Sequence, residues 1–190
     1  MNELQQYISS YFGLKSESIE RISSLFRPTK LSKGSLLLET GQTCQQLSFV
    51  RSGLLRIYVS TERGGEVTQW ISTQGYFITD LSSFVFGSPA RWTIQALSDA
   101  ELFTIDKADY QSIGQHIPEW HEFEVRFLTR CFSMMEDRIF AHLSMTAEER
   151  YRAFFEGNKE LFNQVPLQYI ASLLGMTPET FSRIRKKDSL

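Results

Sequence analysis

Apolar positions repeat with different periods along the chain, and the first region has a helical period. Its apolar residues lie three or four positions apart: Leu4, Ile8, Phe12, Ile19, Ile22 and Phe26. This spacing is typical of amphipathic helices, so we expect one over residues 2–12 and another over residues 16–26. Pro28 is expected to end the helical region, because proline cannot continue a helix.

Between Thr29 and about Ile105 the chain consists of short apolar runs separated by glycine-containing turns. A period of two is visible in Leu54, Arg56 and Tyr58, and again in Val67, Gln69 and Ile71. Such alternation indicates strands with one buried face. The turns contain glycines at positions 34, 41, 53, 64, 65, 75 and 87. Many short strands with frequent turn signals predict an all-β barrel or sandwich in this region.

After Ile105 the period becomes helical again, and a short helix is expected before Pro118. Residues 119–145 then contain no proline or glycine and can form one continuous helix. Two neighbouring stripes run along this helix. The first holds Trp120, Phe123, Phe127, Arg130 and Met134, and the second holds Leu128, Phe132, Met135 and Ile139.

A helix that is apolar over so wide an arc must be covered from more than one side. We expect the β region to cover one side and a second copy of the same helix to cover the other. This predicts a homodimer whose interface holds Phe123, Phe127, Arg130 and Met134. The alternative is a single core helix inside one domain.

The C-terminal segment carries the most specific pattern in the chain. Residues 146–163 are expected to form a further helix with a break at Gly157-Asn158. Two short helices then follow around Gly175, and Thr177 is positioned to cap the second one. That helix ends in a cluster of cations, which are Arg183, Arg185, Lys186 and Lys187. Two short helices around a glycine turn, the second of them basic, predict a helix-turn-helix that binds DNA.

Composition narrows the class of protein. The 190 residues carry a formal net charge of −2, so a DNA contact must come from a local basic patch rather than from bulk charge. Cys44 and Cys131 lie far apart without metal-ligand spacing, which predicts no disulfide framework, metal site or other cofactor. The N-terminus is unlike a secretory signal, and no apolar run approaches the roughly 20 residues that cross a bilayer. We therefore expect a soluble cytoplasmic protein.

The order of these parts resembles the cyclic-AMP receptor protein (Crp/Fnr) family of bacterial transcription regulators. In the β region the likeness depends on Gly34, Gly41 and Gly53 with the residues around them. It implies an α+β fold with an N-terminal double-stranded β-helix (β-roll), a long dimerisation helix and a C-terminal helix-turn-helix. The implied domains are a sensor at 1–118, a dimer helix at 119–145 and a DNA-binding domain at 146–190. The chain stops soon after the basic run, so we expect the last domain to lack a wing.

The family's nucleotide cassette has a degenerate counterpart here. Arg91 matches the arginine that holds the cyclic phosphate, and its planar fork suits phosphate oxygens. Asp80 stands one residue out of register with the glutamate that holds the ribose, and Trp92 replaces a small hydroxyl residue. The resemblance makes Asp80, Arg91 and Thr93 candidate effector-binding residues. We expect an effector of unknown identity other than cyclic AMP, or no effector. The alternative role for Arg91 is that of a structural arginine on the surface.

The resemblance also assigns roles in the helix-turn-helix. Glu179 matches the position that accepts from a cytosine amino group, and Arg183 matches the one that donates to guanine. The remaining candidate DNA-binding residues, suited to capping or to phosphate contacts, are Thr177, Thr180, Ser182 and Lys186.

The sequence therefore predicts a homodimeric transcription regulator whose partners are double-stranded DNA and a second copy, with no membrane contact. No nucleophile and base are paired in a known catalytic motif, so we expect no enzyme and no catalytic residues. One alternative is a cyclic-nucleotide-binding regulatory module whose C-terminal helices mediate protein contacts. Another is a small β-barrel enzyme, but metal ligands would be needed on its strands, and no histidine lies in the β region.

Overall fold

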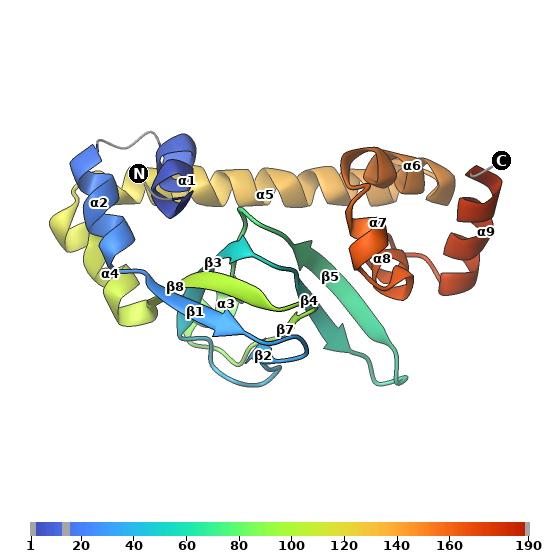
Figure 1. The fold of residues 1–190 in the computed structure, drawn as a ribbon, viewed down its shortest axis with the longest axis horizontal. Coiled ribbons are helices and arrows are strands. Elements are labelled where there is room, and N and C mark those ends of the chain that lie inside the picture. The colour runs from blue at the N-terminus through green and yellow to red at the C-terminus, as the bar shows by residue number, and fades with distance from the viewer. Residues whose placement is uncertain (1–2, 13–15, 189–190) are drawn as a thin grey trace.

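A computed structural model describes residues 3–12 and 16–188 of the chain. One long helix, α5 (Trp120–Ser144), runs along the length of the molecule, and a β-roll lies beneath it (Figure 1). The N-terminal helices α1 (Glu3–Phe12) and α2 (Ser16–Ser24) lie at one end with α4 (Lys107–His116). The C-terminal helices lie at the other end. They are α6 (Ala147–Gly157), α7 (Leu161–Gln164), α8 (Leu167–Leu173) and α9 (Pro178–Asp188).

Two four-stranded antiparallel sheets form the β-roll. One has the order β1 (Arg27–Leu31), β8 (Ala100–Asp106), β3 (Gln46–Ser52) and β6 (Phe77–Ile78). The other has the order β2 (Leu36–Leu38), β7 (Thr93–Ala96), β4 (Leu55–Ser60) and β5 (Glu66–Ser72). The short helix α3 (Leu81–Phe86) lies between β6 and β7. The predicted α+β fold with an N-terminal β-roll is confirmed.

One glycine shows why this region depends on its turns. Gly53 has φ +90°, and a Cβ there would lie 2.5 Å from the carbonyl oxygen of Asp99. Real Cβ atoms do not approach backbone so closely, so only glycine fits between β3 and the loop before β8. Gly53 thus marks a close approach between two backbone segments as well as a turn.

The main core lies between the two sheets and extends to α1, α2, α4 and α5. A chain of aromatic contacts joins the sheet to the long helix. Phe49 packs edge-on against Phe77 at 5.2 Å between ring centroids, and Phe77 packs against Phe127 at 5.3 Å. Trp120 and Phe123 are also buried in this core. The first half of α5 is therefore fixed to its own β-roll by one apolar face.

The C-terminal helices have a second core of their own. Tyr151 contacts Phe162 and Phe181 at centroid distances of 5.8 and 5.4 Å. Helix α6 begins at a capping box, in which Thr146 and Glu149 satisfy each other's backbone N–H groups. Leu54 and Ile71 of the β-roll belong to this second core, so the C-terminal helices pack on the sheet instead of standing apart from it.

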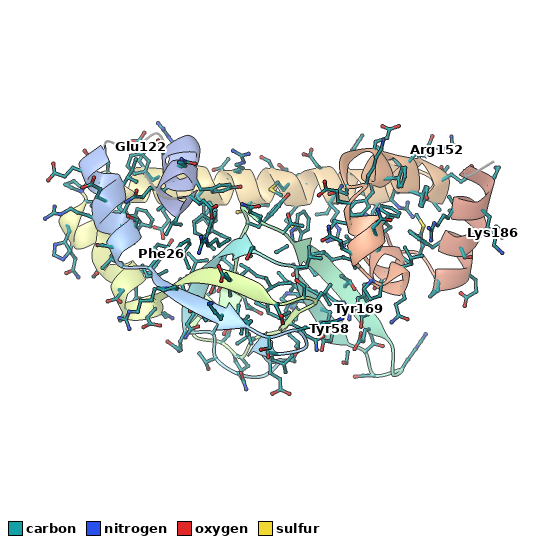
Figure 2. All side chains as sticks on the ribbon, viewed as in Figure 1. Phe26, Tyr58, Glu122, Arg152, Tyr169 and Lys186 are labelled. Atoms are coloured by element: carbon teal, nitrogen blue, oxygen red, sulfur yellow. The ribbon has the colours of Figure 1, made fainter. Side chains whose placement is uncertain are left out.

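The free edge of β5 is the surface on which α8 docks. Ser172 Oγ accepts from the backbone N–H of Thr68 at 2.9 Å and donates to the carbonyl oxygen of Glu66 at 3.2 Å. One hydroxyl thereby satisfies two polar groups that an edge strand would otherwise leave to solvent. Figure 2 shows Tyr58 of the β-roll and Tyr169 of α8 close together at this junction.

The predicted helices are present, with one local difference. The first two helices span 3–12 and 16–24, but Pro28 lies within strand β1, where it is opposite Phe103. This is an edge strand, where a residue without an N–H is tolerated. The break expected at Gly157-Asn158 within residues 146–163 is present, and it separates α6 from α7. The stretch 119–145 forms one helix of 25 residues.

Candidate nucleic-acid interface and effector cassette

The predicted helix-turn-helix corresponds to α8, a four-residue turn and α9. Gly175 in the turn has φ +67°, and Met176 N–H donates to the carbonyl oxygen of Ala171 at 2.9 Å. This is the left-handed closure that favours glycine at a helix C-terminus. Thr177 Oγ1 then accepts from the backbone N–H of Thr180 at 3.2 Å, which caps α9.

Helix α9 has one buried face and one exposed face. Phe181 and Ile184 are buried in the second core, with 2% and 6% of their surface exposed. Glu179, Ser182, Arg183 and Lys186 are exposed, and their spacing places them together on the opposite face. Figure 2 shows Lys186 at the outer end of the molecule, pointing away from the rest of the chain. The structure thus brings the predicted base and phosphate contacts together on one accessible surface.

Glu179 is held as an acceptor at the start of this surface. The pKa of its carboxyl is lowered by hydrogen bonds from its own backbone N–H and from Thr177. An ionised carboxylate in this position suits a cytosine amino group, which only donates. Thr180 is half-buried, and its hydroxyl accepts from Thr177 Oγ1 at 3.2 Å, so these two threonines shape the helix start.

The cations of α9 differ in their contacts. Lys187 Nζ lies 2.9 Å from Glu148 Oε1, which ties the end of α9 to α6. Arg183 and Lys186 lie on the exposed face with no salt bridge among the described residues. They remain available to a polyanion, whereas Lys187 is used to position the helix.

The cassette residue Asp80 is buried, and its carboxylate is already used. It is the N-cap of α3, and Oδ1 accepts from the backbone N–H of Ser83 at 3.0 Å. Oδ2 accepts from the N–H groups of Arg91 and Trp92 at 3.0 and 3.3 Å. Only 4% of the residue is exposed. This carboxylate therefore joins the two ends of the cassette and has little capacity left for a sugar hydroxyl.

The other two candidate effector-binding residues lie nearby but do not converge with it. Thr93 is buried; its hydroxyl accepts from Thr40 N–H at 3.1 Å and lies 3.0 Å from Thr40 Oγ1. Arg91 is exposed. In place of a polar cradle, α3 presents apolar side chains to solvent, which are Leu81, Val85 and Phe86.

The residues predicted for the dimer interface differ in exposure: Phe123 is buried, Phe127 and Met134 are half-buried, and Arg130 is exposed. Phe123 is 9% exposed in its own core, and Phe127 contacts Phe77. Arg130 and Met134 line a cavity between α5 and the β-roll. The interface expected at this first stripe stays a prediction, and the exposed large apolar residues of α5 lie elsewhere on the helix. They are Val125, Leu128, Phe132, Ile139, Phe140 and Leu143.

Three of these exposed residues belong to the second stripe recognised in the sequence, and the rest were missed. Val125 and Leu143 continue that stripe by one step of three or four residues at each end. Extending the stripe by one further step of three or four residues at each end would have found these two. Within the described residues, no group of three histidine, cysteine or acidic side chains could hold a metal ion, and no helix is long and apolar enough to cross a membrane.

Comparisons with known proteins agree with this architecture. Residues 28–116 match the cyclic nucleotide-binding domain family. The fumarate and nitrate reduction regulatory protein of Escherichia coli K12 is 25% identical over 187 residues, covering 91% of this chain and 73% of that protein. Its counterpart in Vibrio cholerae is 24% identical over the same coverage.

Solved structures share the fold. FixK2 from Bradyrhizobium japonicum superposes with a TM-score of 0.71 at 17% identity, covering 85% of this chain and 83% of that one. The Thermus thermophilus catabolite activator protein has a TM-score of 0.59 at 22% identity, covering 93% and 84%. The relatives from Escherichia coli and Vibrio cholerae are regulatory proteins. The matched domain, the likeness along nearly the whole chain and the shared fold together support the resemblance to the Crp/Fnr family of transcription regulators.

Proposed function

We propose that the protein is a homodimeric transcription regulator that binds double-stranded DNA through the exposed face of α9. The single observation that carries this proposal is the composition of that face. It places Glu179, Arg183 and Lys186 at helical spacing on a capped helix whose opposite side is buried. A helix of this kind suits the major groove, where Arg donates to guanine and Glu accepts from cytosine.

Dimerisation is proposed through the exposed stripe of α5. The residues of this stripe follow one another at steps of three and four positions. They are Val125, Leu128, Phe132, Met135, Ile139 and Leu143. Phe132 is 64% exposed and Leu143 is 83% exposed, which is unusual for so many large apolar residues on one helix. Pairing with the same stripe of a second copy would bury them in the manner of a two-stranded coiled coil.

This arrangement gives a geometric reason for the long helix. A symmetric dimer built on α5 carries two copies of α9, related by a two-fold axis. Such dimers contact two half-sites about one helical turn of DNA apart, or roughly 34 Å. Within this proposal residues 1–118 form the sensor or scaffold, 119–145 the dimer helix and 146–190 the DNA-binding domain.

The β-roll is proposed to respond to an effector other than cyclic AMP. Two of the three polar groups expected to hold a cyclic nucleotide, Asp80 and Thr93, are bonded within the protein. A site of several convergent polar groups loses most of its affinity when some of them are already paired. Effector binding would then shift the population of dimer geometries that place both α9 helices on DNA.

The test is to select bound fragments from a random DNA pool and then measure mobility shifts on the enriched sequence. Arg183→Ala should weaken binding roughly tenfold to a hundredfold and relax the preference for guanine at one position of each half-site. Lys186→Ala should weaken binding to all sequences alike and lower the salt slope by about 1. Arg63→Ala, an exposed arginine in the turn between β4 and β5, is the matched control.

If the wild-type protein shows no salt-sensitive DNA binding, the proposal is wrong. That result would favour the alternative, in which the C-terminal helices of a cyclic-nucleotide-binding module contact another protein. Equal losses in Arg183→Ala and Arg63→Ala would also count against α9 as the contacting helix.

A further inference from the structure

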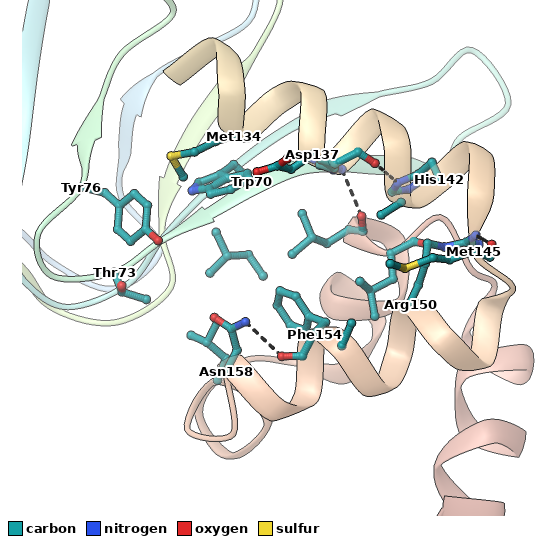
Figure 3. A pocket seen from close by; sticks show the side chains of 17 residues that line it. Trp70, Thr73, Tyr76, Met134, Asp137, His142, Met145, Arg150, Phe154 and Asn158 are labelled. Atoms are coloured by element: carbon teal, nitrogen blue, oxygen red, sulfur yellow. Dashed lines mark hydrogen bonds between the residues drawn. The ribbon is translucent and has the colours of Figure 1, made fainter. Parts of the chain in front are cut away.

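A cavity of about 350 Å³ lies where the β-roll, the long helix and the C-terminal helices meet. Figure 3 shows it between β5, α5 and the helices that follow α5. Much of its wall is apolar or aromatic, including Trp70, Tyr76, Met134 and Phe154. It is separate from the cassette around Asp80, and its size is within the range of small-molecule sites.

Two guanidinium groups line this cavity. Arg138 on α5 donates to the carbonyl oxygen of Gln69 and, at 3.0 Å, to that of Leu173. Arg150 on α6 donates to the carbonyl oxygens of Leu174 at 3.2 Å and Met145 at 2.7 Å. Within the part of the chain that the structure describes, neither guanidinium meets a carboxylate.

Both arginines are half-buried, and among the described residues their guanidinium groups donate only to backbone carbonyl oxygens. Burial lowers the pKa of Arg138 from its ordinary value, which reflects the cost of holding that charge away from water. A buried charge is ordinarily paired, and each guanidinium has five N–H donors, of which two are used in each case. The remaining N–H groups can donate to an anion.

One acidic residue, Asp137, also lines this cavity, and its carboxylate lies apart from the guanidinium of Arg150. Asp137 is exposed, and in the view of Figure 3 it lies over Trp70, away from Arg150 and Met145. His142 lies on the side of Arg150, and its Nδ1 is 3.0 Å from the carbonyl oxygen of Arg138. In this view Trp70 and Tyr76 thus lie on one side of the cavity, and Arg150 and His142 lie on the other.

We propose that this cavity binds a small amphipathic anion, whose apolar or aromatic body packs on Trp70, Tyr76 and Phe154 while its acidic group pairs with Arg138 and Arg150. Carboxylate, sulfonate and phosphate groups all match the guanidinium fork. Arg138 and Asp137 lie on the side of α5 away from the exposed stripe, so a second copy of the helix leaves the cavity open.

The cavity walls come from three parts of the protein, and this gives the ligand a means to act. A bound anion would draw α5 and α6 together through their arginines, and its body would contact β5 at Trp70. It would therefore stabilise the arrangement in which the C-terminal helices dock on the β-roll. As an effector site this deepens the proposed function, while binding of the anion itself does not depend on DNA binding.

The experiment uses two fluorescent probes that share an aromatic body and differ in charge. One is anilinonaphthalene sulfonate, and the other is the neutral N-phenyl-naphthylamine. Both are titrated into the full-length protein without DNA. We expect saturable binding of the sulfonate at least tenfold tighter than that of the neutral probe, and a rise in the unfolding temperature with the sulfonate. Equal affinities, or no saturable binding of the sulfonate, would overturn the proposal.

Variants locate the binding. Arg150→Gln should weaken the sulfonate about tenfold and leave the neutral probe unchanged, whereas Arg150→Lys should retain most of the affinity. Arg152→Gln, an exposed arginine on the same helix that does not line the cavity, is the matched control. Equal losses in Arg150→Gln and Arg152→Gln would contradict the site.

A variant at an uncharged position tests the site independently, in case the arginine variants fail to fold. Ala141→Leu adds bulk to the cavity wall without altering charge, and it should reduce binding of both probes. If this variant binds the sulfonate like the wild type, the probe lies elsewhere and the proposal fails. DNA affinity, measured separately without any probe, tests the proposed function on its own.

Discussion

The guanidinium carbon of Arg56 lies 3.6 Å from the centre of the Tyr169 ring. Arg56 belongs to β4 and Tyr169 to α8, so this contact joins the β-roll to the first helix of the helix-turn-helix. Arg56 is 1% exposed and is also held by Glu66 Oε2 at 2.6 Å and Thr68 Oγ1 at 2.9 Å. The docked position of α8 thus completes the environment of a buried cation.

Replacing Tyr169 with alanine should loosen this docking. The change removes one aromatic face from a desolvated guanidinium, a contact worth roughly 1–2 kcal/mol. We expect the free energy of unfolding in urea to fall by at least that amount. The Thr68 amide, which donates to Ser172 on α8, should exchange its hydrogen faster. Tyr169→Phe retains the ring and is the matched control. Unchanged exchange at Thr68 in Tyr169→Ala would show that the contact does not hold α8.

Cyclic AMP should bind weakly or not at all. The Asp80 carboxylate accepts three backbone N–H bonds, and binding a ribose there would require breaking some of them. Calorimetry should therefore detect no binding tighter than about 1 mM. Trp92→Ser removes the indole but leaves Asp80 bonded, so it should not create affinity. Micromolar binding by the wild type would show that the cassette rearranges.

The parts that could be predicted from the sequence depend on local signals. Gly175 and Thr177 fix the turn and the cap of α9 within a few residues, so the helix-turn-helix follows from neighbouring positions. Gly34, Gly41 and Gly53 all have positive φ, and each marks a turn at which the chain reverses. Such residues act through backbone conformation, which is encoded nearby.

What could not be predicted depends on contacts between distant segments. Both stripes of α5 are apolar, and the contact that holds Phe127 of the first stripe against the β-roll comes from Phe77, which is distant in the sequence. The alternating pattern places Arg56 on a strand. Its burial beneath the Tyr169 ring could not be predicted, because Tyr169 lies more than a hundred residues later in the sequence. For Asp80 a local signal did exist. An aspartate three residues before Ser83 fits a helix N-cap, and this pattern predicts an internal role.

The capping box of α6 should make stability depend on acid. Glu149 accepts from Thr146 N–H at 2.7 Å and Thr146 Oγ1 at 2.8 Å, and these bonds lower its pKa below the ordinary value of 4.5. A lowered pKa stabilises the folded state above the unfolded pKa, and the contribution is lost as pH falls through the folded pKa. The urea midpoint of Glu149→Gln should therefore lie below that of the wild type at pH 7 and approach it near pH 3. Glu20→Gln, on α2, is the control.

Glutamate in the exposed stripe of α5 should separate the dimer. Phe132→Glu with Ile139→Glu places two carboxylates per chain where apolar side chains would meet a second copy, and burying such unpaired charges is costly. Sedimentation should give a monomer with unchanged far-UV circular dichroism and a lower unfolding temperature. Phe86→Glu, at an exposed apolar residue of α3, should remain dimeric.

A third change distinguishes the two stripes of the helix. Phe127→Glu introduces a charge beside Phe77, inside the chain's own core. It should lower the free energy of unfolding by roughly 3–5 kcal/mol, the usual range for losing a buried aromatic, and reduce the yield of folded protein. If Phe127→Glu instead gives a stable, folded monomer while the pair at Phe132 and Ile139 leaves the dimer intact, the first stripe forms the interface. That outcome would require α5 to rotate relative to the β-roll when two copies associate.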